Sequence, residues 1–300
     1  MDEVWTPPKL VSWITQDLQK RGLPPSHRLE AELLVSKALD ISRLDLFLQF
    51  DRPVTEEERG KVKALLQRRR LREPVAYIVG NAHFWNLELF VGPGVLIPRS
   101  DTENLVDKTL EWLKATDKGQ KRKVIELGAG SLCISLSLAT ELMGLEICAL
   151  EASAEAFKYA QKNLDKYQEQ LAELENKIHL ILADSFGVLD EVGKDTGEID
   201  LIISNPPYIA VNELAALQEE VRDFEPTMAL EAGETGLDFY HLLASEAEKR
   251  LVHGGCLAFE HGSTQKEEIL TLMQNYTGLQ IIEHIKDLSG LDRGMLWEKK

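Results

Sequence analysis

The chain has 300 residues, of which 44% are apolar, and it carries a formal net charge of −16 from 34 basic and 50 acidic side chains. This length allows one large core or two modest ones, and the composition is that of neither a disordered nor a fibrous protein. Residues 1–75 hold 14 basic and 12 acidic side chains while the remainder holds 20 and 38, so most of the chain repels phosphate backbones and is unsuited to tight, non-specific binding of duplex nucleic acid.

The first 75 residues contain only helical patterns. Apolar side chains within Leu10 to Leu18 are spaced along one face of a first helix, and Ser26 is placed to cap a second. Thr55-Glu-Glu-Glu58 has the capping-box pattern of a third helix, which a proline ends. We therefore predict a small helical bundle as the first domain, residues 1–75.

Residues 76–100 change character. The segment Phe84–Val91 is rich in strand-forming residues with partial alternation, and glycine, asparagine and proline flank it as turn residues. We predict a β-hairpin linker over residues 76–100 and a helix over Asp101–Ala115.

Strand and helix patterns alternate from residue 121 to the end of the chain. Strands are predicted at Val124–Leu127, Glu146–Leu150, Ile178–Leu182, Ile199–Ile203 and Cys256–Phe259, with closing strands at Gly278–Ile285 and Gly294–Trp297. This alternation is typical of a parallel, doubly wound sheet with helices on both faces. We therefore predict an α/β fold with a Rossmann-like domain over residues 101–300.

Three further features of the sequence concern disulfides and metals, membrane segments, and the cellular compartment. Cys133, Cys148 and Cys256 are widely spaced, which predicts buried, reduced thiols and neither a disulfide framework nor a zinc site. The first residues are acidic and no long apolar run is free of charges, so we expect no signal peptide and no membrane span. We expect a cytoplasmic monomer without a metal site.

A glycine-containing loop, Glu126-Leu-Gly128-Ala129-Gly130-Ser131, follows the first strand of the α/β domain. Glycine allows a tight turn and a close approach of the backbone to a ligand, although an ordinary strand-to-helix turn has the same composition. A dinucleotide site needs a third glycine where Cys133 stands, which disfavours NAD and favours a cofactor without pyrophosphate.

Two acidic residues follow the next two strands. Glu151 ends the second strand, where a carboxylate can accept both ribose hydroxyls of an adenosine; the alternative is an acid that caps the next helix. Asp184 follows the third strand and can reach an adenine amino group, or serve as a helix cap or turn residue.

The most specific motif is Asn205-Pro206-Pro207-Tyr208, directly after the fourth strand. The Asn205 side-chain oxygen and the Pro206 carbonyl can each accept one N–H of a planar NH2 group, which orients its nitrogen and stabilises the positive charge that develops on it. The prolines stiffen the loop, and the Tyr208 ring can stack on a flat substrate. We therefore predict methylation of an amide or amino nitrogen by S-adenosylmethionine (SAM).

At these residues the sequence resembles the HemK/PrmC family, the protein-(glutamine-N5) methyltransferases of peptide chain release factors. The resemblance spans nearly the whole chain. Beyond Asn205–Tyr208 it includes the segments Pro74–Gly80, Phe84-Trp85, Val95–Glu103, Val221–Pro226, Glu260–Gly262 and Asp287–Arg293.

The resemblance implies a helical N-terminal domain that docks the release factor and a Rossmann-like domain that binds SAM. It implies that Asn205 to Tyr208 hold the glutamine amide of a Gly-Gly-Gln motif, and we also assign Arg99, within a matching segment, to the substrate. By position, Glu126 and Gly128 to Leu132 would contact the cofactor at its methionine end, Glu151 its ribose, and Asp184 and Ser185 or Phe186 its adenine.

This chain departs from the family pattern at three positions. Leu132 stands where the family usually has a third glycine, so the leucine either crowds the cofactor or the loop shifts. Ser100 replaces a usual proline, and Ser185, which cannot stack on adenine, replaces an aromatic residue for which Phe186 can compensate.

Two alternative functions stay open at this point. An adenine-N6 methyltransferase of nucleic acid would use the same loop but needs a basic groove, which the acidic composition disfavours. The second alternative is a catalytically weak homologue that only binds the release factor. The basic run Gln67–Arg72 predicts a solvated helix face; its alternative is a contact with an acidic partner or with ribosomal RNA.

Overall fold

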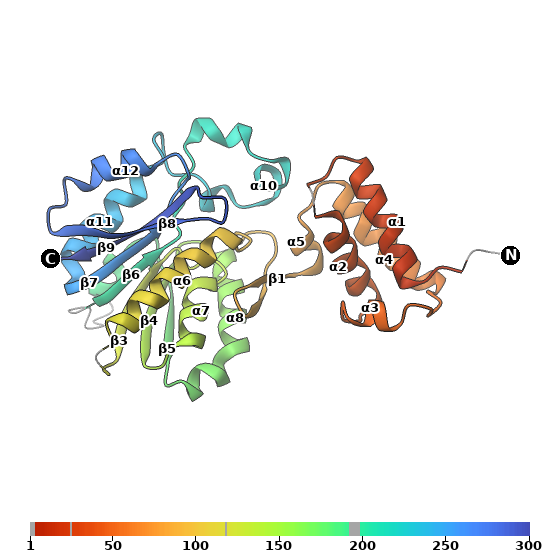
Figure 1. Cartoon of the computed structure of the whole chain (residues 1–300), viewed down its shortest axis with the longest axis horizontal. Helices are drawn as coiled ribbons and strands as arrows, with labels where there is room; N and C mark the ends of the chain where they lie inside the picture. Colours follow the sequence, from red (N-terminus) through yellow and green to blue (C-terminus); the bar gives the residue numbers. More distant parts are fainter. Residues whose placement is uncertain (1–3, 25, 118, 192–198) are drawn as a thin grey trace. The chain divides into compact units, whose positions relative to one another are not determined.

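The computed structural model describes residues 4–24, 26–117, 119–191 and 199–300. The chain divides into two compact units, which are described separately (Figure 1). The helical unit contains residues 1–81 together with the short segment 218–224, and the second unit contains residues 82–217 and 225–300. The domain boundaries at residues 75 and 100 stay a prediction.

The helical unit is a bundle with one apolar core. Its helices are α1 (Pro7–Lys20), α2 (His27–Leu39), α3 (Asp45–Leu48), α4 (Glu56–Arg70), α5 (Val75–Val79) and, from the distant segment, α10 (Glu219–Phe224). Ile14, Leu18 and Leu34 are fully buried in the core between α1 and α2. The predicted capping box is present, since Thr55 N–H donates to Glu58 (2.8 Å) and Glu58 N–H donates to the Thr55 hydroxyl (3.2 Å). Ser26 precedes α2, but its side chain makes no capping hydrogen bond.

The basic run at the end of α4 is neutralised within the helical unit. Arg68 pairs with Glu73, Arg70 with Asp17 and Arg72 with Glu219. Arg69 is fully buried and bridges Glu30 (2.7 Å) and Glu220 (2.8 Å). The prediction of a solvated face is therefore wrong for Arg69, and all four guanidinium groups already have carboxylate partners. α10 is held to the helical unit by two of these arginines.

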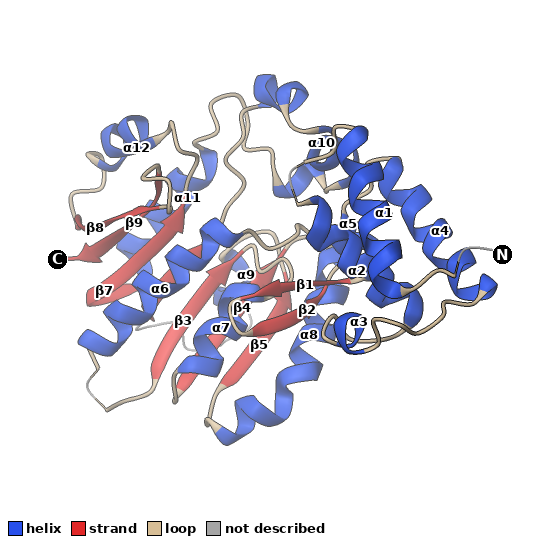
Figure 2. Ribbon diagram, turned by 45° about the vertical axis from the view of Figure 1, so that its right-hand side comes forward, coloured by secondary structure: helices blue, strands red, loops and turns tan. Residues whose placement is uncertain are grey.

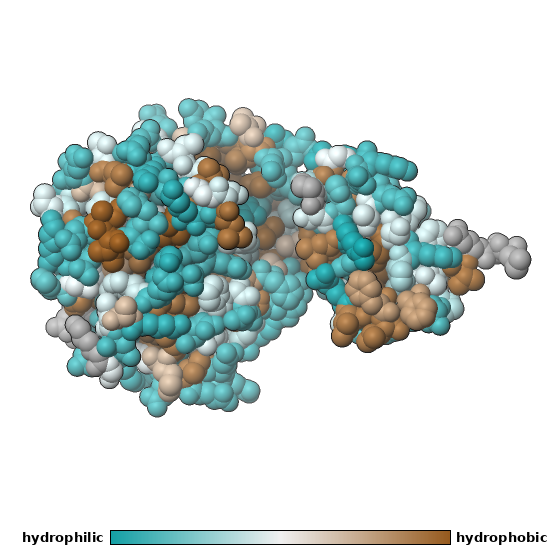
Figure 3. Space-filling view, viewed as in Figure 1, coloured by the Kyte–Doolittle hydropathy of each residue, from teal (hydrophilic) through white to brown (hydrophobic). Residues whose placement is uncertain are grey.

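Apolar side chains gather on the surface of the helical unit around α3 (Figure 3). Leu44, Phe47, Leu48 and Phe50 are all at least half exposed. Contiguous exposed apolar patches of this kind on a small domain are typical of interaction surfaces.

The second unit contains a seven-stranded sheet in the order β5-β4-β3-β6-β7-β9-β8. Its strands are β3 (Arg122–Leu127), β4 (Leu145–Glu151), β5 (Lys177–Leu182), β6 (Ile199–Ser204), β7 (Leu251–Glu260), β8 (Leu279–Lys286) and β9 (Asp292–Lys299). β3 to β7 run parallel, and β9 is antiparallel to both β7 and β8. The predicted α/β fold class is confirmed.

Helices cover both faces of this sheet, as expected for buried parallel strands. The helices are α6 (Ser100–Ala115), α7 (Cys133–Glu141), α8 (Ala154–Glu173), α9 (Gly187–Glu191), α11 (Asp238–Arg250) and α12 (Lys266–Met273), with short 3-10 turns η1 (Val211–Ala216) and η2 (Thr227–Ala229). α6, α7 and α8 pack on the face that Val124 and Leu201 present, and α9, α11 and α12 on the face of Ile125 and Ile202. Figure 1 shows α6 lying along the direction of the strands on its face.

A separate two-stranded hairpin precedes α6, as predicted (Figure 2). It is formed by β1 (Asn81–Phe84) and β2 (Leu87–Phe90). Asn163 of α8 fixes it, because its side-chain oxygen accepts from Phe90 N–H (2.7 Å) and its amide donates to Phe90 O (3.1 Å). None of the described helices is long and apolar enough to cross a membrane.

Candidate active site

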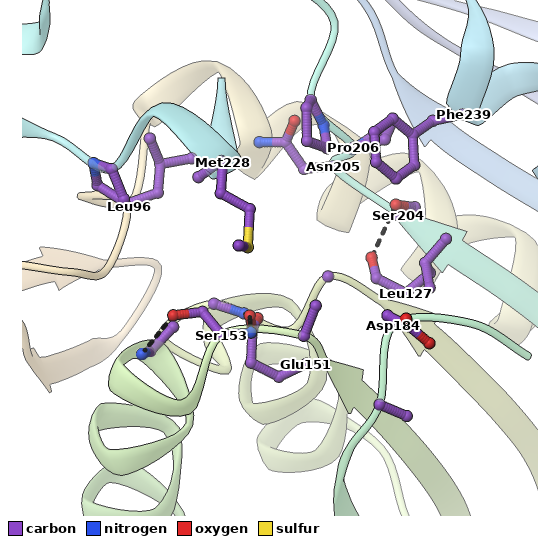
Figure 4. Close-up of a pocket in the computed structure, with 18 of the residues that line it drawn as sticks. Leu96, Leu127, Glu151, Ser153, Asp184, Ser204, Asn205, Pro206, Met228 and Phe239 are labelled. Carbon is purple, nitrogen blue, oxygen red and sulfur yellow. Dashed lines mark hydrogen bonds between the residues drawn. The ribbon is translucent and has the colours of Figure 1, made fainter. Parts of the chain in front are cut away.

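A cavity opens at the carboxyl ends of β3, β4 and β6, where an open α/β sheet places its ligands. It holds about 770 Å³ of empty space, counted out to its open mouth. It is lined by Gly94, Leu96, Leu127, Gly128, Gly130, Glu151, Ala152, Ser153, Ala156, Ala183, Asp184, Ser204, Asn205, Pro206, Pro207, Pro226, Met228, Ala229 and Phe239. In Figure 4, Asn205 and Pro206 lie on one wall, and Glu151 and Ser153 on the opposite one.

The glycine loop forms the floor of the cavity. Gly128 and Gly130 both have positive φ (74° and 55°), which glycine adopts without the steric penalty of a side chain. The N–H groups of Gly128 and Ala129 donate to the carbonyl of Leu150 at 2.9 Å. The loop therefore folds back onto the end of β4, and its two glycines line the cavity.

Glu151 is held by backbone donors at both carboxylate oxygens. Gly130 N–H donates to Oε2 and Ser153 N–H to Oε1, each at 2.7 Å. Ser153, not Glu151, supplies the side-chain cap of α8, because its hydroxyl accepts from Ala156 N–H (3.2 Å). Each carboxylate oxygen has a further lone pair, so Glu151 can accept two neighbouring hydroxyls of a ligand in the cavity.

Leu132 does not line the cavity. Its φ is +69°, the left-handed conformation, and its side chain is 0% exposed within the core that α7 forms with the sheet. A glycine adopts this backbone conformation at lower cost. The leucine therefore has unfavourable backbone geometry and a fully packed side chain, and it does not crowd the cavity.

At position 132 we expect glycine to be tolerated better than alanine, although both variants should be less stable than the parent. Leu132→Ala should lower the free energy of unfolding by about 2–5 kcal/mol through the cavity it leaves. Leu132→Gly should cost about 1 kcal/mol less than the alanine variant, because glycine relieves the left-handed strain. Urea titration of the full chain measures the order Leu, Gly, Ala, while SAM affinity should stay unchanged in the glycine variant. An alanine variant more stable than the glycine variant contradicts this account.

The three residues assigned to the adenine differ in placement. Asp184 is exposed and lines the cavity. Ser185 is not among the lining residues, and Phe186 is buried in the second core cluster, with the Arg250 guanidinium 6.0 Å from its ring centroid. Asp184 therefore lies at the cavity wall, and Ser185 and Phe186 do not.

The Asn205–Tyr208 loop contributes three lining residues, Asn205, Pro206 and Pro207. Asn205 Nδ2 donates to the Thr102 hydroxyl of α6 at 3.0 Å, while its Oδ1 accepts no hydrogen bond from the described residues. The carboxamide of Asn205 thus has its nitrogen engaged and its oxygen available.

Tyr208 lies at the other end of the loop and does not line this cavity. Its ring packs against the second core cluster, and its carbonyl accepts from the Gln265 side chain (2.9 Å). Burial raises the pKa of the Tyr208 hydroxyl to about 12, so the phenol stays protonated at neutral pH and is no candidate for a general base. The side-chain oxygen of Gln265 also accepts from Gly262 N–H (2.9 Å), so the side chain that holds the Tyr208 carbonyl is itself fixed in position.

The remaining predicted site residues lie beside the cavity, not in its lining. Glu126 is buried and accepts from the Ser135 backbone and hydroxyl, and burial raises its pKa to about 8. Ala129 and Ser131 are buried as well. Arg99 pairs with Glu225 (2.6 Å), which also accepts from Ile97 N–H.

Several lining residues carry no signal in the sequence. Leu96, the neighbours Met228 and Ala229, and Phe239 come from three different places in the chain, and none was predicted to contact a ligand. Figure 4 shows the Met228 side chain reaching into the space between the two walls. Leu96 and Pro226 do lie within segments that resemble the family, Val95–Glu103 and Val221–Pro226, but neither was predicted to line the site.

Comparison with known proteins decides the family. The PrmC N-terminal domain matches residues 9–80, and the methyltransferase small domain matches residues 103–223. The release factor glutamine methyltransferase of Geobacter sulfurreducens is 36% identical over 291 residues, which cover 97% of this chain and 96% of that protein. The chain belongs to the release factor glutamine methyltransferase family. The family member of Chlorobaculum tepidum is 37% identical over 273 residues, 89% of each chain.

The fold is shared more widely than the release factor glutamine methyltransferase family. The crystal structure of the hMettl16 catalytic domain in complex with the MAT2A 3'UTR hairpin 6 matches with a TM-score of 0.51 and 19% identity, over 70% of this chain and 75% of that one. A likeness at this level of identity concerns the fold alone.

The cavity fits SAM, the methyl donor that membership of this methyltransferase family implies. Its described lining residues include no lysine or arginine, so it suits a cofactor without pyrophosphate. Glu151 offers two acceptor oxygens for a pair of ribose hydroxyls, and Leu127, Ala156 and Phe239 offer apolar surface. Bound SAM supplies a methyl group on a positively charged sulfonium.

Proposed function

We propose that this protein methylates the side-chain amide nitrogen, N5, of the glutamine in the Gly-Gly-Gln motif of a peptide chain release factor. The family to which the chain belongs supports the reaction, and the arrangement around Asn205 supports the assignment of its parts. The methyl group comes from SAM, and the products are a thioether, a methylated amide and one proton.

The observation that carries the proposal is the orientation of Asn205. Its Nδ2 donates to Thr102, so its Oδ1 is the atom left to accept an N–H from a substrate at the cavity. An amide nitrogen is a poor nucleophile because its lone pair is delocalised into the carbonyl. Acceptors at Asn205 Oδ1 and the Pro206 carbonyl hold both N–H bonds, orient the lone pair and stabilise the charge that develops on nitrogen.

We assign Gly128, Gly130, Glu151 and Asp184 to the cofactor and Asn205, Pro206 and Pro207 to the glutamine amide. Both groups of residues line one cavity. The Tyr208 ring packs against the second core cluster. We therefore propose that Tyr208 stabilises the loop, in addition to its predicted contact with the substrate.

We assign docking of the release factor to the helical unit. The exposed side chains Leu44, Phe47, Leu48 and Phe50 give it an apolar surface of the kind that binds protein partners. The arginines Arg68 to Arg72 have intramolecular carboxylate partners, which argues against an electrostatic contact with RNA through that run. Because release factors act in translation, we also propose a cytoplasmic location; the monomeric state stays a prediction.

Mass spectrometry of a release factor after incubation with the protein and SAM tests the proposal. We expect a gain of one methyl group on the glutamine of the Gly-Gly-Gln motif and none on the same factor with that glutamine replaced by alanine. DNA and RNA serve as competing substrates in parallel reactions with labelled SAM. Label in nucleic acid alone would favour an adenine-N6 methyltransferase, and SAM binding without any transfer would favour a homologue that only binds.

A further inference from the structure

Two buried side chains from distant parts of the chain form a hydrogen-bonded chain behind Asn205. The Thr102 hydroxyl accepts from Asn205 Nδ2 at 3.0 Å and donates to Glu260 Oε2 at 2.5 Å. Thr102 is 1% exposed and Glu260 is 3% exposed, so water does not compete for either group. Neither residue lines the cavity, and neither therefore has a place in the site described above.

The chemistry of the three groups fixes the direction of both hydrogen bonds. An ionised carboxylate can only accept, so Thr102 must donate its single hydroxyl proton to Glu260. The Thr102 oxygen then has only lone pairs left for Asn205, which must present its NH2 group. This leaves Asn205 Oδ1 at the other end of the carboxamide. An asparagine side chain alone has no such preference, because its oxygen and NH2 ends are nearly equal in shape.

We propose that Thr102 and Glu260 are positioning residues that hold the Asn205 carboxamide with its oxygen toward the substrate amide. The inference rests on the proposed function, because the oxygen is needed only if the substrate offers an N–H. With the carboxamide reversed, two NH2 groups would face each other at the cavity, and neither could accept.

The surroundings of Glu260 make this orientation sensitive to pH. Around the carboxyl lie charged and titratable groups from several described elements: Asp101 of α6, Arg99 before it, the Cys133 thiol of α7, Arg293 of β9 and the phenols Tyr208 and Tyr240. Burial raises the pKa of Glu260 to about 7, and the nearby Asp101 adds to the rise while Thr102 and the two arginines oppose it. Below that pH a protonated Glu260 becomes a donor, and the Thr102 hydroxyl is no longer obliged to accept from Asn205.

The first test is Thr102→Val against Thr109→Val, the same substitution two turns along α6. Thr109 is also fully buried, and its hydroxyl has no hydrogen-bond partner among the described residues. We expect Thr102→Val to lower kcat about 10- to 100-fold, the size expected when one buried hydrogen-bonding partner is lost. KM for the release factor and SAM affinity should stay near the parent values, Thr109→Val should retain the parent kcat, and Thr102→Ser should restore most of it.

The second test is the pH profile of kcat. The parent protein should lose activity as the pH falls through about 7, because the protonated form of Glu260 gives up the fixed orientation. Glu260→Gln carries no charge at any pH and should have a low kcat with no acid limb at that pH. If Glu260 contributed only to stability, Glu260→Gln would lower the amount of folded enzyme, but the midpoint of the acid limb in the pH profile would be the same as in the parent.

A third measurement does not depend on activity. In a 15N NMR spectrum, the side-chain NH2 signals of Asn205, identified by their loss in Asn205→Ala, should be protected from solvent exchange in the parent. They should lose that protection in Thr102→Val but not in Thr109→Val. This reading stands even if a variant is too inactive to assay.

Two results would overturn the inference. One is a Thr102→Val variant with the kcat and pH profile of Thr109→Val; the other is an Asn205 NH2 group that exchanges equally fast in the parent and in Thr102→Val. A parent protein that binds SAM but leaves the release factor unmethylated, with the Asn205 NH2 protected, would instead refute the proposed function and keep the hydrogen-bonded chain.

Discussion

Asn205→Ala is expected to lower kcat for methyl transfer about 10²- to 10³-fold, the scale of removing one preorganised polar contact to a developing charge. The variant loses the acceptor at the cavity wall and, with it, the orientation of the substrate amide. SAM affinity should stay near the parent value, because the proposed cofactor residue Glu151 lies on the opposite wall (Figure 4). Single-turnover methylation of a release factor and calorimetric titration with SAM measure the two effects separately.

A matched variant separates catalysis from disruption of the loop. Val211→Ala shortens an exposed side chain in η1, three residues beyond Tyr208, and should retain the parent rate. Asn205→Asp keeps an acceptor at the cavity but turns a second carboxylate oxygen toward Thr102, whose one proton is already donated to Glu260. We expect Asn205→Asp to be impaired as well. Parental kcat in Asn205→Ala would refute the role of this residue.

Arg69→Met is expected to destabilise the helical unit by about 3–5 kcal/mol, the cost of removing one partner from a buried ion pair. Arg69 is 0% exposed and contacts both Glu30 and Glu220, so its loss leaves two carboxylates without a cation. Hydrogen exchange followed by mass spectrometry on the full chain should show faster exchange in peptides of α2 and α4. The segment 218–224 should exchange faster too, because Arg69 supplies one of the two ion pairs that join it to the rest of the helical unit among the described residues.

Arg68→Met is the control for this prediction. Arg68 precedes Arg69 in the same helix, but its side chain is exposed, and its pair with Glu73 lies at the surface. Exposed ion pairs contribute about 0–1 kcal/mol, so exchange in α2 should hardly change. Equal effects of the two substitutions would show that burial of the Arg69 cluster contributes little to stability.

Much of the fold was predictable from the sequence because the long elements have strong periodic patterns. The helix at α6 and the strands β3, β4 and β6 were expected close to their observed positions, and the hairpin was expected from its turn residues. The short helices α3 and α5 were not, since four or five residues give too little periodicity to detect. The placement of α10 with the helical unit depends on ion pairs formed 147 to 151 residues apart, for which local sequence carries no signal.

The site was predictable where the chemistry is local and not where it depends on packing. Gly128, Gly130, Glu151 and Asn205 follow strand ends, and the parallel topology brings such ends together. Sequence could not tell that Leu132 turns into the core, because its orientation is set by a left-handed backbone conformation. Nor could it relate Asn205 to Thr102, 103 residues earlier, or Thr102 to Glu260, 158 residues later.

The assignment of α10 has a consequence for exchanging parts between homologues. A chimera that takes residues 1–81 from one relative and everything else from another would pair the Arg69 and Arg72 of one lineage with the residues at 219 and 220 of the other. We expect such a chimera to fold stably only when residues 1–81 and residues 218–224 are taken from the same relative. An isolated fragment of residues 1–81 would likewise leave Arg72 without Glu219 and Arg69 with Glu30 but without Glu220, so the helical unit is encoded by two separate stretches of the gene.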